Sequence, residues 1–187
     1  MIRRLRGEAG YSLVEMVTVM AIMGIVFGGL ADIFTSASKA DTDMQNRFTA
    51  QLNTRLALDK LRRDIHCAKD VTPNTPNPWT SSQSTLTLVI TACGGGDVTW
   101  CTAQMSGSTT RWSLYRLGNS DTCSSSTGIK LADYLTTSTP FTSFAHVTGC
   151  GCLASVGVSL PVAVNRVTTT GIYKLTDTIY LRNSTRI

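Results

Sequence analysis

Glu15 is the only charged residue in an apolar run of 21 residues that extends from Tyr11 to Ala31. An isolated carboxylate in such a run costs on the order of several kcal/mol unless an opposite charge pairs with it. Ionisable residues inside membrane segments are functional candidates for this reason. The residue type and its position therefore predict an ion-pairing site in an apolar environment.

Cysteines form a second set of reactive side chains, and all of them lie beyond residue 66. They are Cys67, Cys93, Cys101, Cys123, Cys150 and Cys152. An even number confined to one part of the chain predicts disulfide bonds, which persist in oxidising compartments. We expect Cys93 to pair with Cys101, because the glycines between them would permit a tight return. A bond from Cys67 to another cysteine would fasten the end of a helix to a sheet, whereas Cys150 and Cys152 lie too close together for their partners to be assigned.

Zinc is the alternative use of these thiols, because imidazole nitrogens stand beside them. His66 adjoins Cys67, and His146 precedes Cys150 and Cys152. These spacings lack the paired C-x-x-C arrangement of structural zinc sites. We therefore expect no metal site and no cofactor.

Catalytic motifs are missing from the sequence. Gly94-Gly-Gly-Asp97 has no following Lys-Ser/Thr and so is a turn rather than a phosphate loop. No Gly-x-Ser-x-Gly elbow occurs, and neither of the two histidines has a neighbourhood that marks it as a general base. The protein is not expected to be an enzyme.

Residues 1–34 are the element that must position Glu15. Residues 1–10 are a basic leader with Arg3, Arg4 and Arg6, and as a helix the 21 apolar residues that follow would reach about 31 Å, enough to cross a bilayer. Because positive flanks stay in the cytoplasm, we expect a single-pass membrane protein with a cytoplasmic N-terminus and an extracytoplasmic head. The alternative is an ordinary signal peptide, but helix-compatible sequence continues beyond Ala31 instead of ending at a cleavage site.

The stretch Gly10-Tyr-Ser-Leu-Val-Glu15 resembles the junction of type IV prepilins and type II secretion pseudopilins, a prokaryotic family. The resemblance implies that a prepilin peptidase cuts after Gly10 and methylates Tyr11, where phenylalanine is commoner. It also implies that Glu15 pairs with a terminal amine during filament assembly. The implied partners are membrane lipid before assembly, the inner-membrane assembly platform, and other pilin-like subunits bound through the N-terminal helix.

A long helix followed by a β-rich head is the expected architecture. Residues 11–34 would be its membrane or filament-core part, and 35–70 an amphipathic part that continues into the head. The apolar stripe of this second part consists of Phe34, Ala37, Ala40, Met44, Phe48, Leu52, Leu56, Leu61 and Ile65.

Residues 71–187 are expected to form a head with disulfides. Strands are predicted at 85–91, 110–117, 156–164 and 172–182, with Pro161 marking an edge strand or a bulge. The predicted fold class is α+β and pilin-like: one long N-terminal helix packed on an antiparallel β-sheet.

Three further segments narrow the resemblance to PulJ/PilW-type minor pilins or pseudopilins. They are Leu61–Ile65, Trp112–Arg116 and Asp177–Asn183. The resemblance implies a subunit of a type IV pilus or a type II secretion-like filament that helps initiate assembly or form the tip complex. Such a subunit ends in a cell-surface or periplasmic filament.

The alternative function is a pilus-tip binding module for DNA, a surface or a secreted substrate. The net charge of +5 includes +2 from the leader (three arginines and Glu8), which leaves +3 after cleavage. The basic residues of the head are Arg111, Arg116, Lys130, Arg166, Lys174, Arg182 and Arg186. Because separated charges need not form a stripe, DNA is the less favoured ligand.

Overall fold

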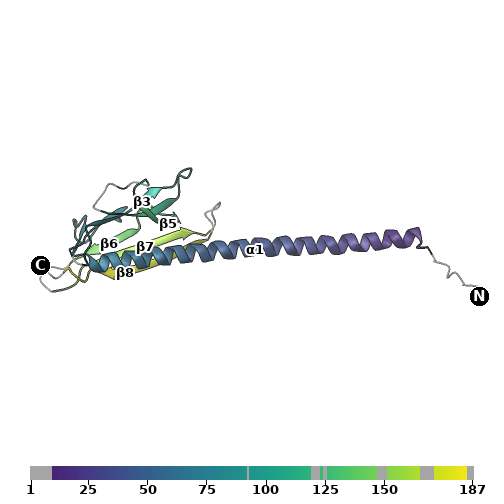
Figure 1. The fold of residues 1–187 in the computed structure, drawn as a ribbon, viewed down its shortest axis with the longest axis horizontal. Helices are drawn as coiled ribbons and strands as arrows, with labels where there is room; N and C mark the ends of the chain where they lie inside the picture. Colours follow the sequence, from purple (N-terminus) through teal and green to yellow (C-terminus); the bar gives the residue numbers. More distant parts are fainter. Residues whose placement is uncertain are drawn as a thin grey trace, which may run out of the picture. The chain divides into compact units, whose positions relative to one another are not determined.

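One long helix and eight strands make up this computed structural model, which describes residues 10–91, 93–118, 123, 126–146, 151–164 and 171–184. The chain divides into two compact units, one ending at Met44 and one beginning at Gln45. Helix α1 (Leu13–Cys67) contributes to both, and Figure 1 shows the strands gathered around its C-terminal part. We describe each unit separately.

Helix α1 is long because no proline interrupts residues 13–67. It ends where Asn183 caps it: the Asn183 Nδ2 donates hydrogen bonds to the carbonyl oxygens of His66 and Cys67, at 3.1 and 3.2 Å. These carbonyls lie in the last turn and have no acceptor role inside the helix. A side chain more than 100 positions later therefore terminates α1.

All strand pairings in the sheet are antiparallel. The strands are β1 (Asp70–Thr72), β2 (Thr85–Val89), β3 (Val98–Gln104), β4 (Trp112–Gly118), β5 (Ile129–Leu135), β6 (Phe141–Ala145), β7 (Ser155–Ala163) and β8 (Ile172–Tyr180). Strands β1 to β5 pair in sequence order, and β7 then pairs with both β5 and β6. Strand β8 pairs with β7 over nine residues. The α+β fold class with a long N-terminal helix and an antiparallel sheet is confirmed.

Pro161 lies in an interior strand, so the expectation of an edge strand or a bulge is wrong. Strand β7 is paired with β8 along its whole length without a register shift, and with β6 and β5 at its two ends. Pro161 falls between the last β6 pair, at Val158, and the β5 pair, at Val162. Among the described residues no pair joins β7 to β5 or β6 between these positions, so the N–H that proline lacks falls where that side of the ladder is interrupted.

The face of α1 that packs on the sheet combines small side chains with large aliphatic ones. Its buried residues are Ala50, Thr54, Ala57, Leu58, Leu61, Asp64 and Ile65. Alanines let the helix backbone approach the sheet closely, and the Thr54 hydroxyl is satisfied by the carbonyl oxygen of Ala50 at 2.6 Å. The sheet contributes large side chains to the same core, including Trp100, Phe141 and Phe144.

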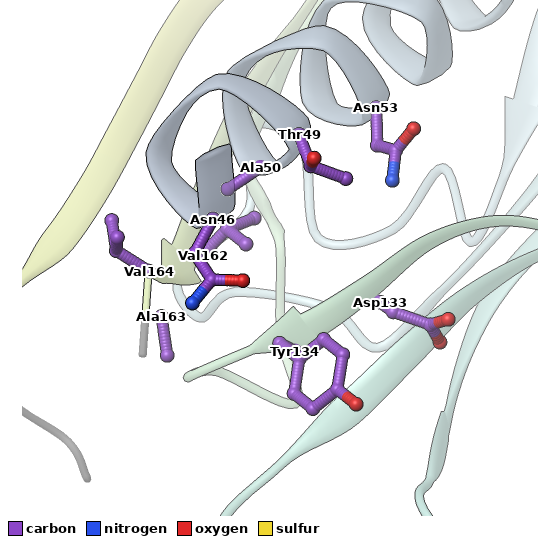
Figure 2. A pocket seen from close by; sticks show the side chains of 9 residues that line it. All are labelled: Asn46, Thr49, Ala50, Asn53, Asp133, Tyr134, Val162, Ala163 and Val164. Atoms are coloured by element: carbon purple, nitrogen blue, oxygen red, sulfur yellow. The ribbon is translucent and has the colours of Figure 1, made fainter. Parts of the chain in front are cut away.

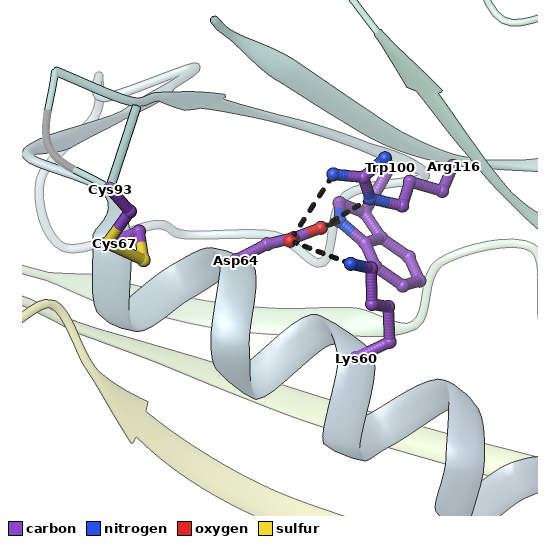
Figure 3. A network of polar contacts seen from close by, with 6 residues as sticks. All are labelled: Lys60, Asp64, Cys67, Cys93, Trp100 and Arg116. Atoms are coloured by element: carbon purple, nitrogen blue, oxygen red, sulfur yellow. Dashed lines mark hydrogen bonds and ion pairs between the residues drawn. A yellow bond between two sulfur atoms is a disulfide. The ribbon is translucent and has the colours of Figure 1, made fainter. Parts of the chain in front are cut away.

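Asp64 is the one carboxylate among the described buried side chains, and its partners come from the sheet (Figure 3). Trp100 Nε1 on β3 donates to its Oδ2 at 3.0 Å, and Arg116 Nε on β4 donates to the same oxygen at 2.6 Å. Lys60 Nζ lies 3.9 Å from Oδ1 on the solvent side. Buried charges are tolerated when paired and hydrogen-bonded in this way. The cluster fixes the register of α1 against β3 and β4.

Two ion pairs nearer the surface join further parts of the head. Arg62 Nε donates to Asp177 on β8 at 2.7 Å, and this hydrogen bond raises the pKa of Arg62. Lys130 Nζ lies 2.8 Å from Asp133, whose hydrogen bond raises the pKa of Lys130. Both pairs are partly exposed, so each contributes little to stability.

Candidate functional site

Gly10, Tyr11 and Ser12 precede α1 as a non-helical segment. Gly10 is exposed, and the Tyr11 residue is 79% exposed to solvent. Both residues are therefore accessible from outside the chain. The leader residues that precede Gly10 lie outside the described part of the chain.

Glu15 lies in the first turn of α1, where the helix dipole favours a negative charge. The pattern Ser12-x-x-Glu15 is that of a capping box, and the Met16 N–H donates to the Ser12 carbonyl oxygen at 3.1 Å. The Glu15 carboxylate makes no ion pair or hydrogen bond within the described residues, and its side chain is exposed. It is therefore accessible to a cation from outside the chain.

The N-terminal part of α1 carries an apolar surface with no partner inside its own unit. Among the described elements, α1 alone is long and apolar enough to cross a membrane by length and composition, and its most apolar stretch is entirely unburied. Exposed apolar residues run from Leu13 to Phe34. A surface of this kind requires lipid or other apolar helices around it.

A second apolar surface lies on the part of α1 that belongs to the head. Phe48, Leu52 and Leu56, here called the outer stripe, are 66%, 46% and 58% exposed. At about 100° per residue they lie on the side of the helix opposite the buried Leu58 and Leu61. The expected stripe from Phe34 to Ile65 is therefore wrong as a single buried face: its last two members are buried, whereas Phe48, Leu52 and Leu56 face away from the sheet.

The drift of an i, i+4 series explains this outcome. Four residues turn an α-helix by about 400°, so each step moves about 40° around the axis, and a series of several steps cannot stay on one face. Attention to the small residues Ala50, Thr54 and Ala57 would have located the packed face, because close helix–sheet contact favours them. The outer stripe remains an exposed apolar surface.

Two disulfides join parts of the head. Cys67 at the end of α1 pairs with Cys93 in the turn before β3, and Cys101 on β3 pairs with Cys123. The expected pairing of Cys93 with Cys101 is wrong, because the extended strand from Val98 carries Cys101 about 10 Å away from that turn, beyond the reach of one disulfide. Cys152 is also disulfide-bonded, and Cys150 lies outside the described residues.

The zinc alternative conflicts with the observed bonding of its ligands. Cys67 and Cys152 are in disulfides and so present no thiolate. The His66 Nδ1 lies 2.9 Å from the carbonyl oxygen of Tyr180, which it contacts as a hydrogen-bond partner. Among the described residues no group of three or more His, Cys, Asp or Glu side chains could hold a metal ion.

Basic side chains of the head are largely engaged in internal contacts. Arg111 is 7% exposed and lies over the Tyr134 ring at 5.6 Å. Arg116 binds Asp64, and Lys130 binds Asp133. Arg166 and Arg186 lie outside the described residues. Lys174 and Arg182 are exposed and take no part in these contacts, so two of the five described basic residues of this set lie open at the surface.

Comparison with known proteins identifies the N-terminal segment. Residues 5–31 match the family described as the prokaryotic N-terminal methylation motif, which covers Gly10, Tyr11, Glu15 and the start of the apolar helix. No curated protein and no solved structure matches the chain. The matched motif, followed by a long apolar helix and an antiparallel sheet, supports a type IV pilin-like prepilin cleavage and methylation domain at the N-terminal end of this α+β chain.

Proposed function

We propose that this chain is a minor pilin or pseudopilin, a subunit of a type IV pilus or type II secretion-like filament that contributes to assembly initiation or to the tip complex. The observation that carries the proposal is the exposed Glu15 carboxylate in the first turn of an unburied apolar helix, within the matched methylation motif. The protein works by assembly rather than by catalysis. Its resemblance to PulJ/PilW-type proteins supports the minor-subunit role.

Four segments have separate tasks in this proposal. Residues 1–10 are the leader, 11–34 the membrane or filament-core part of the helix, 35–70 the amphipathic part and 71–187 the disulfide-bonded head. The leader keeps the precursor in the cytoplasmic membrane with its N-terminus inside. The disulfides support an extracytoplasmic head, since such bonds persist in oxidising compartments.

Cleavage changes the charge at the start of the helix. A prepilin peptidase cuts after Gly10, which frees the amine of Tyr11, and the same enzyme then methylates that amine. The helix exchanges lipid for the apolar helices of neighbouring subunits at the assembly platform. In that bundle Glu15 pairs with the terminal amine of a neighbour, and each charge offsets the desolvation cost of the other.

The outer stripe supports the same mode of assembly. Its three apolar side chains extend the apolar surface of α1 into the head-bearing part of the helix. Fully burying a Leu or Phe side chain contributes about 1.5–3 kcal/mol, so contact with a neighbouring helix along this stripe would add to the core interactions. A single Glu15 pair then selects the register while apolar contacts supply affinity.

The test compares Glu15→Ala, Glu15→Gln and Glu15→Asp in cells that assemble the filament. Alanine and glutamine variants should lower incorporation at least about tenfold, the equivalent of about 1.4 kcal/mol, with normal expression and processing. Asp32→Asn is the matched control, because Asp32 is an exposed carboxylate of the same helix just beyond the matched motif. Immunoblots of sheared filaments measure incorporation.

Glutamine separates ion pairing from helix capping. It keeps the capping-box pattern with Ser12 but loses the charge. Normal incorporation of Glu15→Gln would contradict the ion-pair mechanism and assign Glu15 to the helix start.

Processing is tested independently by mass spectrometry of the purified protein. The mature chain should begin at Tyr11 and carry one N-methyl group. A Gly10→Leu variant should accumulate as the precursor, because a side chain at this position obstructs the cut. A native chain that begins anywhere else would refute the proposed maturation.

A further inference from the structure

A pocket in the head lies between α1, β5 and β7 (Figure 2). Its cavity volume is about 80 Å³. Asn46 and Asn53 of α1 point into it from one side, and Tyr134 of β5 lies across from them. Val162 and Val164 form part of an apolar wall. The methylation motif lies elsewhere on the chain, and none of the three outer-stripe residues lines the pocket.

A β-bulge in β5 lies at the edge of this pocket. Ser113 of β4 lies opposite two residues of β5, Asp133 and Tyr134, and the register shifts there. Tyr134 has a φ of 60°, in the left-handed region that bulky side chains rarely adopt. Such a conformation costs on the order of 1–3 kcal/mol, and bulges and strained residues concentrate beside binding sites.

The Tyr134 ring is held in place from the side of β4. Arg111, which is buried, places its guanidinium 5.6 Å from the ring centroid. A cation over the face of an aromatic ring attracts it electrostatically. The ring therefore forms a fixed wall of the pocket.

The negative charge of Asp133, which lines the pocket, is neutralised by a neighbouring lysine. The Asp133 carboxylate accepts a hydrogen bond from Ser113 Oγ at 2.6 Å and lies 2.8 Å from Lys130 Nζ. The carboxamides of Asn46 and Asn53, in contrast, make no hydrogen bond within the described residues. Each carries two N–H donors and an acceptor oxygen. The pocket thus offers donors and acceptors without net charge, which suits a neutral polar ligand.

Size and lining narrow the ligand further. The cavity volume of about 80 Å³ is well above the roughly 10–15 Å³ that admits one water, so the pocket can take a small side chain. The apolar lining from Ala50 and Val162 matches an aliphatic side chain, and the carboxamides match a peptide group.

We propose that this pocket binds a neutral peptide segment, with one small aliphatic side chain inserted between Val162 and Tyr134 and its main-chain amide bonded to Asn46 and Asn53. Binding at this site is independent of filament assembly and of Glu15. The head then has a recognition function of its own.

The experiment titrates N-acetylvaline N-methylamide into the full-length protein in detergent micelles. Binding is followed through the side-chain amide signals of Asn46 and Asn53 in ¹H–¹⁵N NMR spectra. A ligand of this size is expected to bind in the millimolar range. Asn53→Ala should raise Kd about tenfold, because a hydrogen bond is lost at an exposed residue whose removal leaves the fold intact.

Two controls keep the result interpretable. Gln51→Ala, on the same helix outside the pocket lining, should leave Kd unchanged. N-acetylaspartate N-methylamide and methyl glucopyranoside should leave both amide signals unshifted, since one is charged and the other presents hydroxyl groups in place of an aliphatic side chain. Absence of a shift with the valine probe, or equal shifts with the glucoside, would overturn the assignment.

Discussion

At the residue scale, the Asp64 carboxylate makes the polar contacts that join α1 to strands β3 and β4. It accepts from Trp100 and Arg116, and the Asp64 side chain is only 9% exposed. Removing one partner of such a cluster leaves the other polar groups buried without a hydrogen-bond partner. The cost of that loss exceeds the net value of the intact bonds.

Asp64→Ala should lower the free energy of unfolding by about 2–3 kcal/mol, because the Trp100 N–H and the Arg116 guanidinium lose their acceptor. Asp64→Asn should cost less, since its oxygen can still accept from Trp100. Asp59→Ala is the control: Asp59 pairs with Arg62 at the exposed surface, so the change should stay within about 0.5 kcal/mol. Urea unfolding of the full-length protein in micelles, followed by tryptophan fluorescence, measures all three.

At the scale of elements, the Cys67–Cys93 disulfide fastens the last turn of α1 to the turn between β2 and β3. The bond closes a loop of 26 residues. Asn183 and the Asp64 cluster act on the same end of the helix. Covalent and polar contacts thus reinforce one junction.

Replacing both cysteines of this bond by serine should cost about 3 kcal/mol, because the unfolded chain regains the entropy of an open loop. The Cys101→Ser/Cys123→Ser double variant closes a loop of similar length, 22 residues, and should cost about as much. Urea midpoints measure both variants. Peptide mapping without reduction checks the connectivity, and a fragment linking Cys93 to Cys101 would contradict the structure.

Sequence reasoning recovered the elements whose signals are local. The long apolar and helical run and the β-branched strands near 85–91, 110–117, 156–164 and 172–182 were predictable from composition and period. Strand β3 was not, because the glycines and cysteines around it indicate a loop. Strand β5 carries Lys130 and Asp133, whose charges obscure its alternation.

The candidate sites divide in the same way. Gly10, Tyr11 and Glu15 form a contiguous pattern, so sequence alone could single them out. The Asp64 cluster, the disulfide partners and the Tyr134 pocket join residues separated by tens of positions. Their proximity depends on strand register, which the sequence pattern does not specify.

At the scale of the whole molecule, the protein presents apolar surface on α1 in both of its units. The head already has a complete core on the opposite side of the helix, built from Leu58, Leu61 and the sheet. Exposed apolar surface on a folded unit marks an interaction site. The outer stripe should therefore matter for assembly and not for stability.

Leu52→Glu should leave the urea midpoint of the full-length protein unchanged and lower its incorporation into filaments at least about tenfold, because a carboxylate would be buried against a neighbouring helix. Ile129→Glu is the matched control, since Ile129 is an exposed apolar residue on β5 outside the stripe. The control should assemble normally. Equal loss of incorporation in both variants would show a general effect of added charge instead.

Because Asn183 caps α1, the C-terminal hydrogen bonds of this helix can form only late in the synthesis of the chain. Ribosomes make α1 early, but the carbonyls of His66 and Cys67 receive their donor only after 116 residues beyond Cys67 have been translated. A chain that ended between Tyr180 and Asn183 would keep all eight strands but would leave these two carbonyl groups without the Asn183 donor.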